Sequence, residues 1–258
     1  MRIRWDVTDD DISRVQTFFA SQAERAFVRR RIHKNVVGPP PSVTRADMWR
    51  IAVGCLLTTQ QRSGPGSAVS RLITTEPNPL SLAACSTKKD VAAFVEKTLT
   101  KAGGIRMAKT IGESLAENLA WLDGDGGWTQ LESAAADLAV CRGRDPRGSD
   151  VEVERRAALL VQTRLKGFGP KQSRNLWQGL GLARYEIPAD SRISKWLRGS
   201  GFPFEVSASA LGDLPVYLLV MDGFQSLCRE AGILPCILDA AIFASFDAEE
   251  WPEDELFW

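Results

Sequence analysis

Apolar residues recur every three or four positions along nearly the whole chain, which is the spacing of α-helices with one buried face. The sequence lacks a convincing series of alternating apolar and polar positions, so the pattern does not favour β-strands. The first helical stretch runs from Asp9 to about Val37, as one long helix or two short ones. The run Gly38-Pro39-Pro40-Pro41 that follows it predicts an extended linker. We therefore expect an all-α fold.

Capping residues predict where several of these helices begin. Thr44, with Asp47 three positions later, is typical of a capping box that opens a helix to about Gln61. Asp150 is expected to cap a helix that ends near Lys166, Asp213 to cap another, and Pro235 to occupy the first turn of a last helix. Further helices are expected at 67–75, 81–85, 88–101, 106–122 and 128–139. The glycine-, arginine- and aspartate-rich break at 142–150 predicts two helical lobes.

The length and composition suit a soluble protein with a substantial core. Its 258 residues, 44% of them hydrophobic, are enough for one large domain or two small intertwined ones. The sequence has no run of eighteen apolar residues, and its first eleven residues are too charged for a signal peptide. We expect an intracellular, cytoplasmic protein with no membrane partner.

The net charge of zero hides an uneven charge distribution. Ten basic and two acidic residues lie between positions 155 and 198, whereas the tail from 247 to 258 carries six acids and no base. A local cationic patch of this kind fits binding to a polyanion. The alternative is a set of solvated helix faces, which we favour for Arg155, Arg156 and Arg184.

The cysteines and the single histidine predict no metal site. Five cysteines, an odd number, are scattered through apolar surroundings, which favours buried, reduced thiols. His33 is the only histidine and lies in a basic run, so a zinc site is not expected. Neither a metal ion nor a small-molecule cofactor is implied.

The segment from Leu165 to Asp190 carries the candidate chemistry. Gly167 and Gly169 flank one residue, Phe168, in a turn whose backbone N–H groups can approach an anion, and a helix begins directly after it. Lys171 begins that helix, and nineteen residues later Asp190 precedes another. An amine and a carboxylate beside a phosphate-binding turn are what nucleophilic attack on a sugar carbon needs. A dinucleotide-binding fingerprint is not favoured, because a preceding strand and a third glycine are missing.

The pattern Leu165-x-Gly167-x-Gly169-x-Lys171, followed by Pro188-x-Asp190, resembles the helix-hairpin-helix DNA glycosylases, and most of all the bifunctional 8-oxoguanine DNA glycosylase/AP lyases. The resemblance implies that Lys171 is the nucleophile and Asp190 its catalytic partner. It also implies two lobes with a DNA-binding cleft between them. Residues 42–140 would form the helical-barrel lobe and 141–258 the hairpin lobe with an acidic tail, on which residues 1–41 would pack. The iron–sulfur cluster of some relatives is not expected, because only two of the cysteines lie near the C-terminus.

The resemblance extends to further DNA contacts. Residues 56–61, Leu-Leu-Thr-Thr-Gln-Gln, resemble a family pattern in which a glutamine fills the gap left by an extruded base, a role for Gln60 or Gln61. An exposed glutamine at a helix end is the alternative. Gly167, Phe168 and Gly169 would hold the DNA backbone through main-chain N–H groups, and Arg192 would contact phosphate.

The base pocket is less well defined by the sequence. The resemblance places Asn175, one turn after Lys171, against the extruded base. One of the C-terminal aromatic residues, for example Trp258, would stack on that base, although core packing is the usual role of such residues. Those aromatic residues are Phe243, Phe246, Trp251, Phe257 and Trp258.

Taken together with the residues, the resemblance implies a monomeric DNA repair enzyme that acts on double-stranded DNA containing a damaged base, excises 8-oxoguanine and nicks the abasic site. Two alternatives stay open. One keeps the chemistry but acts on another base, such as a modified pyrimidine in foreign DNA. The other is a noncatalytic helix-hairpin-helix module, in which Lys171 contacts phosphate and Asp190 is an ordinary helix cap.

Overall fold

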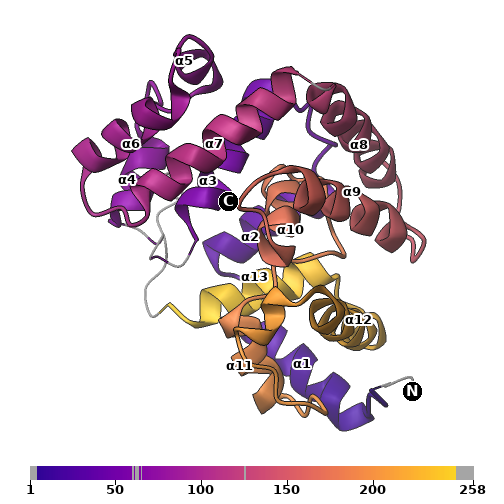
Figure 1. Ribbon diagram of the computed structural model, residues 1–258. Coiled ribbons are helices and arrows are strands. Elements are labelled where there is room, and N and C mark those ends of the chain that lie inside the picture. Colours follow the sequence, from indigo (N-terminus) through magenta and orange to yellow (C-terminus); the bar gives the residue numbers. More distant parts are fainter. Residues whose placement is uncertain (1–4, 60, 62–63, 65, 125, 248–258) are drawn as a thin grey trace.

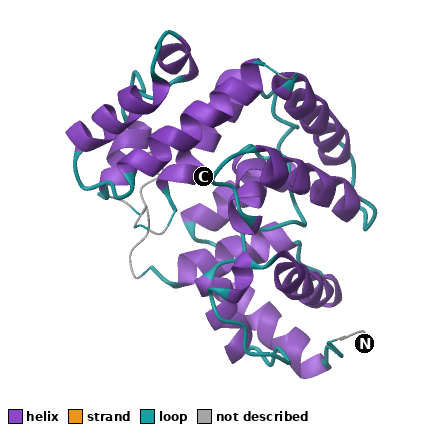
Figure 2. Ribbon diagram, in the orientation of Figure 1, coloured by secondary structure: helices purple, strands orange, loops and turns teal. Residues whose placement is uncertain are grey.

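A computed structural model describes residues 5–59, 61, 64, 66–124 and 126–247. These residues form helices and loops without a strand, which confirms the all-α prediction (Figures 1 and 2). The α-helices are α1 (Asp9–Gln22), α2 (Ala26–Ile32), α3 (Arg45–Leu57), α4 (Ala68–Thr74), α5 (Leu82–Ser86), α6 (Val91–Ala102), α7 (Ala108–Asp123), α8 (Gly127–Arg142), α9 (Asp150–Arg164), α10 (Pro170–Gly179), α11 (Ser191–Gly199), α12 (Leu214–Ala231) and α13 (Pro235–Ser245). A π-helical turn, η1 (His33–Val37), follows α2, and a 3-10 turn, η2 (Ala210–Gly212), precedes α12.

Several helices begin where the capping residues predict. Thr44 and Asp47 form a reciprocal capping box at the start of α3, and Asp213 accepts the N–H of Val216 at the start of α12. The C-terminus of α3 differs from the prediction, since the helix ends at Leu57 rather than near Gln61. The hydroxyls of Thr58 and Thr59 both donate to the carbonyl of Cys55 there, which satisfies a backbone acceptor at the helix end.

The helices enclose two hydrophobic cores. The first includes Trp49 of α3 and Trp177 of α10, and the second includes Tyr217 and Phe224 of α12. Figure 1 shows α3–α7 together in the upper part of the view and α1, α11 and α12 in the lower part, with α10 and α13 between them. Helix α13 contributes alanines to the first core and larger side chains to the second. The division of the chain at residues 41/42 and 140/141 stays a prediction.

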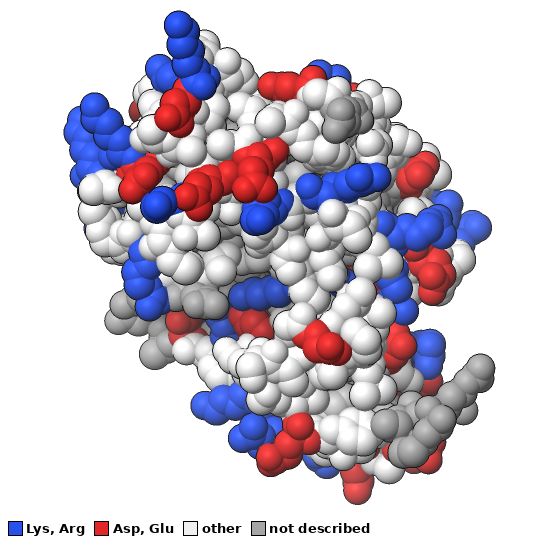
Figure 3. Space-filling model, in the orientation of Figure 1, with Lys and Arg blue, Asp and Glu red and all other residues white. Residues whose placement is uncertain are grey.

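The basic segment between residues 155 and 198 is less exposed than its sequence predicts. Arg184 is only 2% exposed and forms an ion pair of 3.1 Å with Asp150. Arg155 is largely covered as well, because it pairs with Glu186 and Asp222, whereas Arg156 is exposed. The solvated role expected of Arg155 and Arg184 is therefore wrong, and that of Arg156 is confirmed. Figure 3 shows acidic and basic side chains interspersed over the face in view, rather than one broad basic surface.

Asp150 also differs from the prediction. It is the first residue of α9 and does not cap the helix, for which the structure shows no side-chain cap. Its carboxylate instead accepts the N–H of Arg147 at 3.1 Å and pairs with Arg144 and Arg184. A fully buried carboxylate needs such cationic partners, so the tertiary pairing takes precedence over the local cap. No helix in the described ranges is both long and apolar enough to cross a membrane.

Candidate active site

A cavity of about 530 Å³ lies where the two cores meet. This volume is within the range of small-molecule binding sites. Its walls come from α2, the segment after α3, the α9–α10 turn, α10, the start of α11, the η2 region and α13. The lining includes Phe27, Arg31, Thr59, Gln61, Gly167, Gly169, Lys171, Asn175, Gln178, Asp190, Arg192, Asp239 and Phe243.

The turn between α9 and α10 is held by α7. Asn118 of α7 accepts the N–H of Lys166 at 2.6 Å and donates to its carbonyl at 3.1 Å. Gly167 has a φ of +82°, and a Cβ at this position would lie 2.7 Å from Leu56 Cδ2. Only glycine meets both requirements without strain. The turn is thus fixed against α3 and α7 before any ligand arrives.

Two backbone N–H groups of this turn are available to a ligand. Among the described hydrogen bonds, none is made by the N–H of Gly167 or of Gly169. Phe168 differs, because its side chain is 4% exposed within the first core and its N–H donates to the carbonyl of Leu165 at 3.3 Å. The DNA contact expected of the Phe168 N–H stays a prediction, whereas the N–H groups of the glycines on either side make no described hydrogen bond.

Lys171 and Asp190 meet in the cavity. The Lys171 Nζ lies 3.1 Å from Asp190 Oδ2, with side chains 38% and 17% exposed. Lys171 starts on α10, whose Leu176 and Trp177 belong to the first core, whereas Asp190 follows Ile187 and Ala189 of the second core. The packing of the two cores therefore sets the distance between amine and carboxylate.

Asp190 is an ionised carboxylate and a helix cap at once. Its Oδ1 accepts the N–H of Arg192 at 2.8 Å, as an N-cap does, and its Oδ2 faces Lys171 and, at 3.5 Å, Arg192 Nε. Burial alone would raise its pKa, but the charges of Lys171 and Arg192, together with these hydrogen bonds, outweigh burial and lower the pKa below its usual value. The carboxylate is therefore available as a proton acceptor and as a stabiliser of positive charge.

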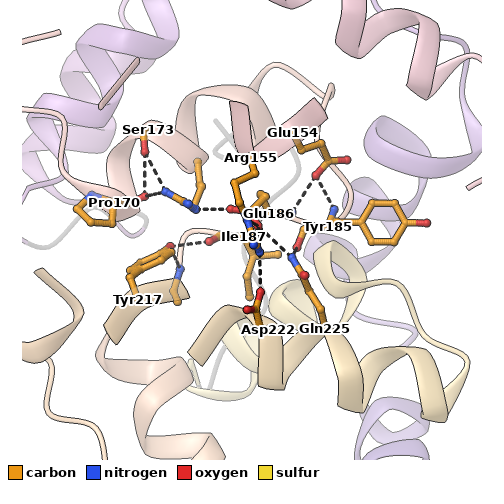
Figure 4. A network of polar contacts seen from close by, with 12 residues as sticks. Glu154, Arg155, Pro170, Ser173, Tyr185, Glu186, Ile187, Tyr217, Asp222 and Gln225 are labelled. Atoms are coloured by element: carbon orange, nitrogen blue, oxygen red, sulfur yellow. Dashed lines mark hydrogen bonds and ion pairs between the residues drawn. The ribbon is translucent and has the colours of Figure 1, made fainter. Parts of the chain in front are cut away.

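A buried polar network, shown in Figure 4, connects the start of α10, which carries Lys171, to the loop that carries Asp190. Glu186, in the loop before α11, accepts Arg174 Nε at 2.7 Å and Arg155 Nη2 at 3.0 Å. Arg174 also donates to the carbonyl of Pro170, the residue that precedes Lys171. Tyr217 of α12 donates to the carbonyl of Ile187 at 2.6 Å and accepts the N–H of Ala189 at 2.8 Å. The start of α10 and the loop that ends at Asp190 are thus tied to one another.

Three further residues from the sequence analysis line the cavity. Arg192 lies over the Phe243 ring, 4.0 Å from its centroid, and is thus held beside the cavity. Asn175 lines the cavity and donates to Gln172 Oε1 at 3.3 Å. Gln61 accepts the N–H of Arg106 at 2.9 Å and donates to the carbonyl of Leu57, so backbone groups already occupy its amide. Gln60 and Trp258 lie outside the described residues.

Sequence reasoning missed other residues of the site. Phe27 stacks on Phe243 with centroids 4.7 Å apart, and both line the cavity. Asp239, Arg31 and Gln178 form a buried polar group at the same cavity. Asp239 could have been found from the sequence, because it is the only charged residue in the otherwise apolar stretch 235–245. Arg31 carries no comparable signal, since it lies in a basic run, and Gln178 is an uncharged residue that nothing in its neighbourhood marks as part of a site.

All five cysteines are buried and free, as the sequence predicts. Burial raises the pKa of the Cys236 thiol to about 12, so this thiol is not reactive at neutral pH. Within the described ranges, no three His, Cys, Asp or Glu side chains are placed to hold a metal ion.

The overall arrangement of helices is shared with a solved DNA glycosylase. That structure is the 8-oxoguanine DNA glycosylase of Methanocaldococcus jannaschii, which superposes with a TM-score of 0.62 over 93% of this chain and 95% of its own, at 13% sequence identity. The similarity establishes the fold. Neither a model of a known protein family nor the sequence of a curated protein matches the chain.

Proposed function

We propose that this protein is a DNA glycosylase with AP lyase activity, which extrudes 8-oxoguanine from duplex DNA and excises it through Lys171. The observation that carries the proposal is the Lys171–Asp190 pair, 3.1 Å apart in a cavity beside a turn with two unpaired backbone N–H groups. The choice of 8-oxoguanine is supported by the shared fold with a glycosylase of that name.

The geometry supports a defined order of steps. Asp190 accepts a proton from Lys171, and the neutral amine then attacks the sugar C1′. The bond from C1′ to the base breaks, and its electron pair leaves with the base, which takes up the proton that Asp190 had accepted. Opening of the sugar ring gives an imine between Lys171 and C1′. Removal of a C2′ proton from this imine expels the 3′ phosphate and nicks the strand.

The surroundings of the pair suit this reaction. Asp190 lies 3.1 Å from the attacking amine, and once it has passed its proton to the base, its negative charge can stabilise the positive charge of the imine. The N–H groups of Gly167 and Gly169, together with the N-terminus of α10, can hold a phosphate of the same strand. This contact fixes position without reading the base sequence.

Borohydride trapping tests the proposal, because the reagent reduces an imine to a stable covalent bond. Duplexes that carry an 8-oxoguanine·cytosine pair or a ready-made abasic site are incubated with the parent, Lys171→Gln and Lys166→Gln. Lys166 is a matched control, since it lies beside the same turn but its side chain is 63% exposed and pairs with Glu117. We expect adducts with the parent and Lys166→Gln and none with Lys171→Gln.

The outcomes separate the alternatives. Adducts on the abasic duplex without excision of 8-oxoguanine would support the lysine mechanism and indicate that the substrate is another damaged or modified base. Binding to every duplex without an adduct would show a noncatalytic DNA-binding module. An adduct that persists in Lys171→Gln would assign the nucleophile to another amine and refute the proposed mechanism.

A further inference from the structure

A charged group lies in the cavity wall formed by α2, α10 and α13, apart from Lys171 and Asp190. Asp239 Oδ2 accepts Gln178 Nε2 at 3.1 Å and lies 3.6 Å from Arg31 Nη1. The three residues are 8%, 1% and 4% exposed, and all line the cavity. Arg31 also lies beside the Phe27 ring, 5.5 Å from its centroid. The steps from Lys171 to strand cleavage do not use this group.

Two atoms of the group are buried without a hydrogen-bond partner. They are Arg31 Nη1, a donor, and Gln178 Oε1, an acceptor. A buried polar atom without a partner costs about 1–3 kcal/mol, which a ligand that pairs with it would recover. A donor, an acceptor and a carboxylate that face one cavity are the complement of a planar ligand with polar groups along its edge.

We propose that Asp239, with Arg31 and Gln178, reads the polar edge of the extruded base and selects guanine-type purines over adenine-type purines. The inference rests on the proposed function and extends it, because it assigns base selection to residues that do not break bonds.

The hydrogen-bonding pattern of the bases supports this selection. A guanine-type edge presents a carbonyl oxygen next to two N–H groups, on N1 and N2. The Asp239 carboxylate can accept both N–H groups, and the Arg31 guanidinium can donate to the carbonyl. An adenine-type edge presents the N1 lone pair and has no carbonyl. Its lone pair would face a carboxylate oxygen, and Arg31 Nη1 would stay without a hydrogen bond.

The charge state of Asp239 agrees with an acceptor role. Burial raises its pKa to about 6, while Arg31 and the hydrogen bond from Gln178 oppose that rise. At pH 7.5 the side chain is therefore ionised and accepts through both oxygens. Guanine and 8-oxoguanine share this edge, so the group selects the purine type, and recognition of the damage lies elsewhere in the site.

The variant Asp239→Asn tests the inference. Single-turnover excision is measured on duplexes with 8-oxoguanine and with 8-oxoadenine, and borohydride trapping is measured on a ready-made abasic site. An amide presents one donor and one acceptor, so it pairs with an adenine-type edge and loses one bond to a guanine-type edge. We expect 8-oxoguanine excision to fall at least about tenfold and the preference over 8-oxoadenine to fall with it. Trapping of the abasic site, which lacks a base, should match the parent. The control is Asp137→Asn, an exposed acid on α8 outside the cavity.

The results either support or overturn the inference. Unchanged 8-oxoguanine excision and preference in Asp239→Asn would overturn it, and so would loss of trapping in a variant that melts like the parent. If Asp239→Asn does not fold, the excision rates of the parent protein test the inference. Equal excision of 8-oxoguanine and 8-oxoadenine by the parent would contradict base selection, and a preference of at least about tenfold would support it. A parent that traps no abasic site refutes the proposed function itself, and the inference falls with it.

Discussion

Replacement of Glu186 by glutamine should destabilise the protein more than any single surface change, because it leaves a buried positive charge without its partner. The side chains of Glu186 and Arg174 are 1% and 0% exposed and 2.7 Å apart. Arg155, the other cation on Glu186, keeps a second carboxylate at 2.7 Å in Asp222, which is largely exposed to solvent. The uncompensated charge therefore falls on Arg174.

The size of the effect follows from this burial. Removal of one partner from a buried ion pair costs about 3–5 kcal/mol, which is a large part of the roughly 5–15 kcal/mol that stabilises a folded protein. We expect Glu186→Gln to lower the free energy of unfolding in urea by about 3–5 kcal/mol. Excision should slow as well at temperatures where the variant is folded, because the same network ties Pro170 to the loop before Asp190.

Two further variants complete the experiment. In Glu205→Gln the lost ion pair is exposed, with Arg198 at 3.6 Å, so stability should change little. In the double variant Arg174→Met/Glu186→Gln no unpaired charge is left, so this protein should be more stable than Glu186→Gln alone. A free energy of unfolding for Glu186→Gln within about 1 kcal/mol of the parent would refute the reasoning, since that is the range of an exposed pair.

Further predictions concern the site and its pH response. Asp190→Asn should fold and bind DNA nearly as the parent does, because an amide also caps α11. Its single-turnover excision rate should fall about 100-fold or more, because the amide carries no charge. An excision rate equal to that of the parent would contradict this. Gly167→Ala should lose at least about 1–2 kcal/mol of stability, because the residue has a φ of +82°. At Gly169 a Cβ meets open space, so Gly169→Ala should melt like the parent but bind DNA more weakly. Equal DNA affinity of Gly169→Ala and the parent in a filter-binding assay would show that the Gly169 backbone does not contact DNA. DNA affinity should fall as salt rises, and a salt-independent Kd would argue against phosphate contacts.

The pH prediction concerns Glu154. Burial raises the pKa of Glu154 to about 7, although three backbone N–H donors lower it. Between about pH 4.5 and 7, the folded protein therefore holds a proton on Glu154 that the unfolded chain has released. The stability that Glu154 contributes is therefore largest below pH 4.5 and is lost as pH rises to 7, and the cost of Glu154→Gln should shrink over that window. Urea titrations at several pH values measure this, and a cost that grows with pH would refute it.

Local signals were enough to predict the Lys171–Asp190 segment. The glycines around Phe168 were predicted from the turn they form, and Asp190 from its position before an amphipathic helix. Both features are set by neighbouring residues. The helix starts at Thr44 and Asp213 were predicted for the same reason, because a cap acts within three residues.

Other residues were misread because their partners are distant in the sequence. Asp150 looks like a cap, yet Arg184, thirty-four residues away, pairs with it inside the protein. Arg155 looks like a solvated residue of a basic segment, yet it pairs with Glu186 and Asp222, which lie thirty-one and sixty-seven residues away. A sequence shows that a residue is charged or apolar, but the pairing that decides its burial depends on the packing of whole helices.

The sequence by itself determined the helical class, most helix boundaries and the identity of the candidate nucleophile and its carboxylate, because each depends on spacing, capping or a short motif. Only the tertiary structure decided that Lys171 and Asp190 come within 3.1 Å of each other, since one is anchored in each hydrophobic core. It also brought Arg31, Gln178 and Asp239 together from three helices far apart in the chain. No local sequence pattern predicts that these three residues meet. Their proximity results from the packing of the apolar helix faces into two cores that border one cavity.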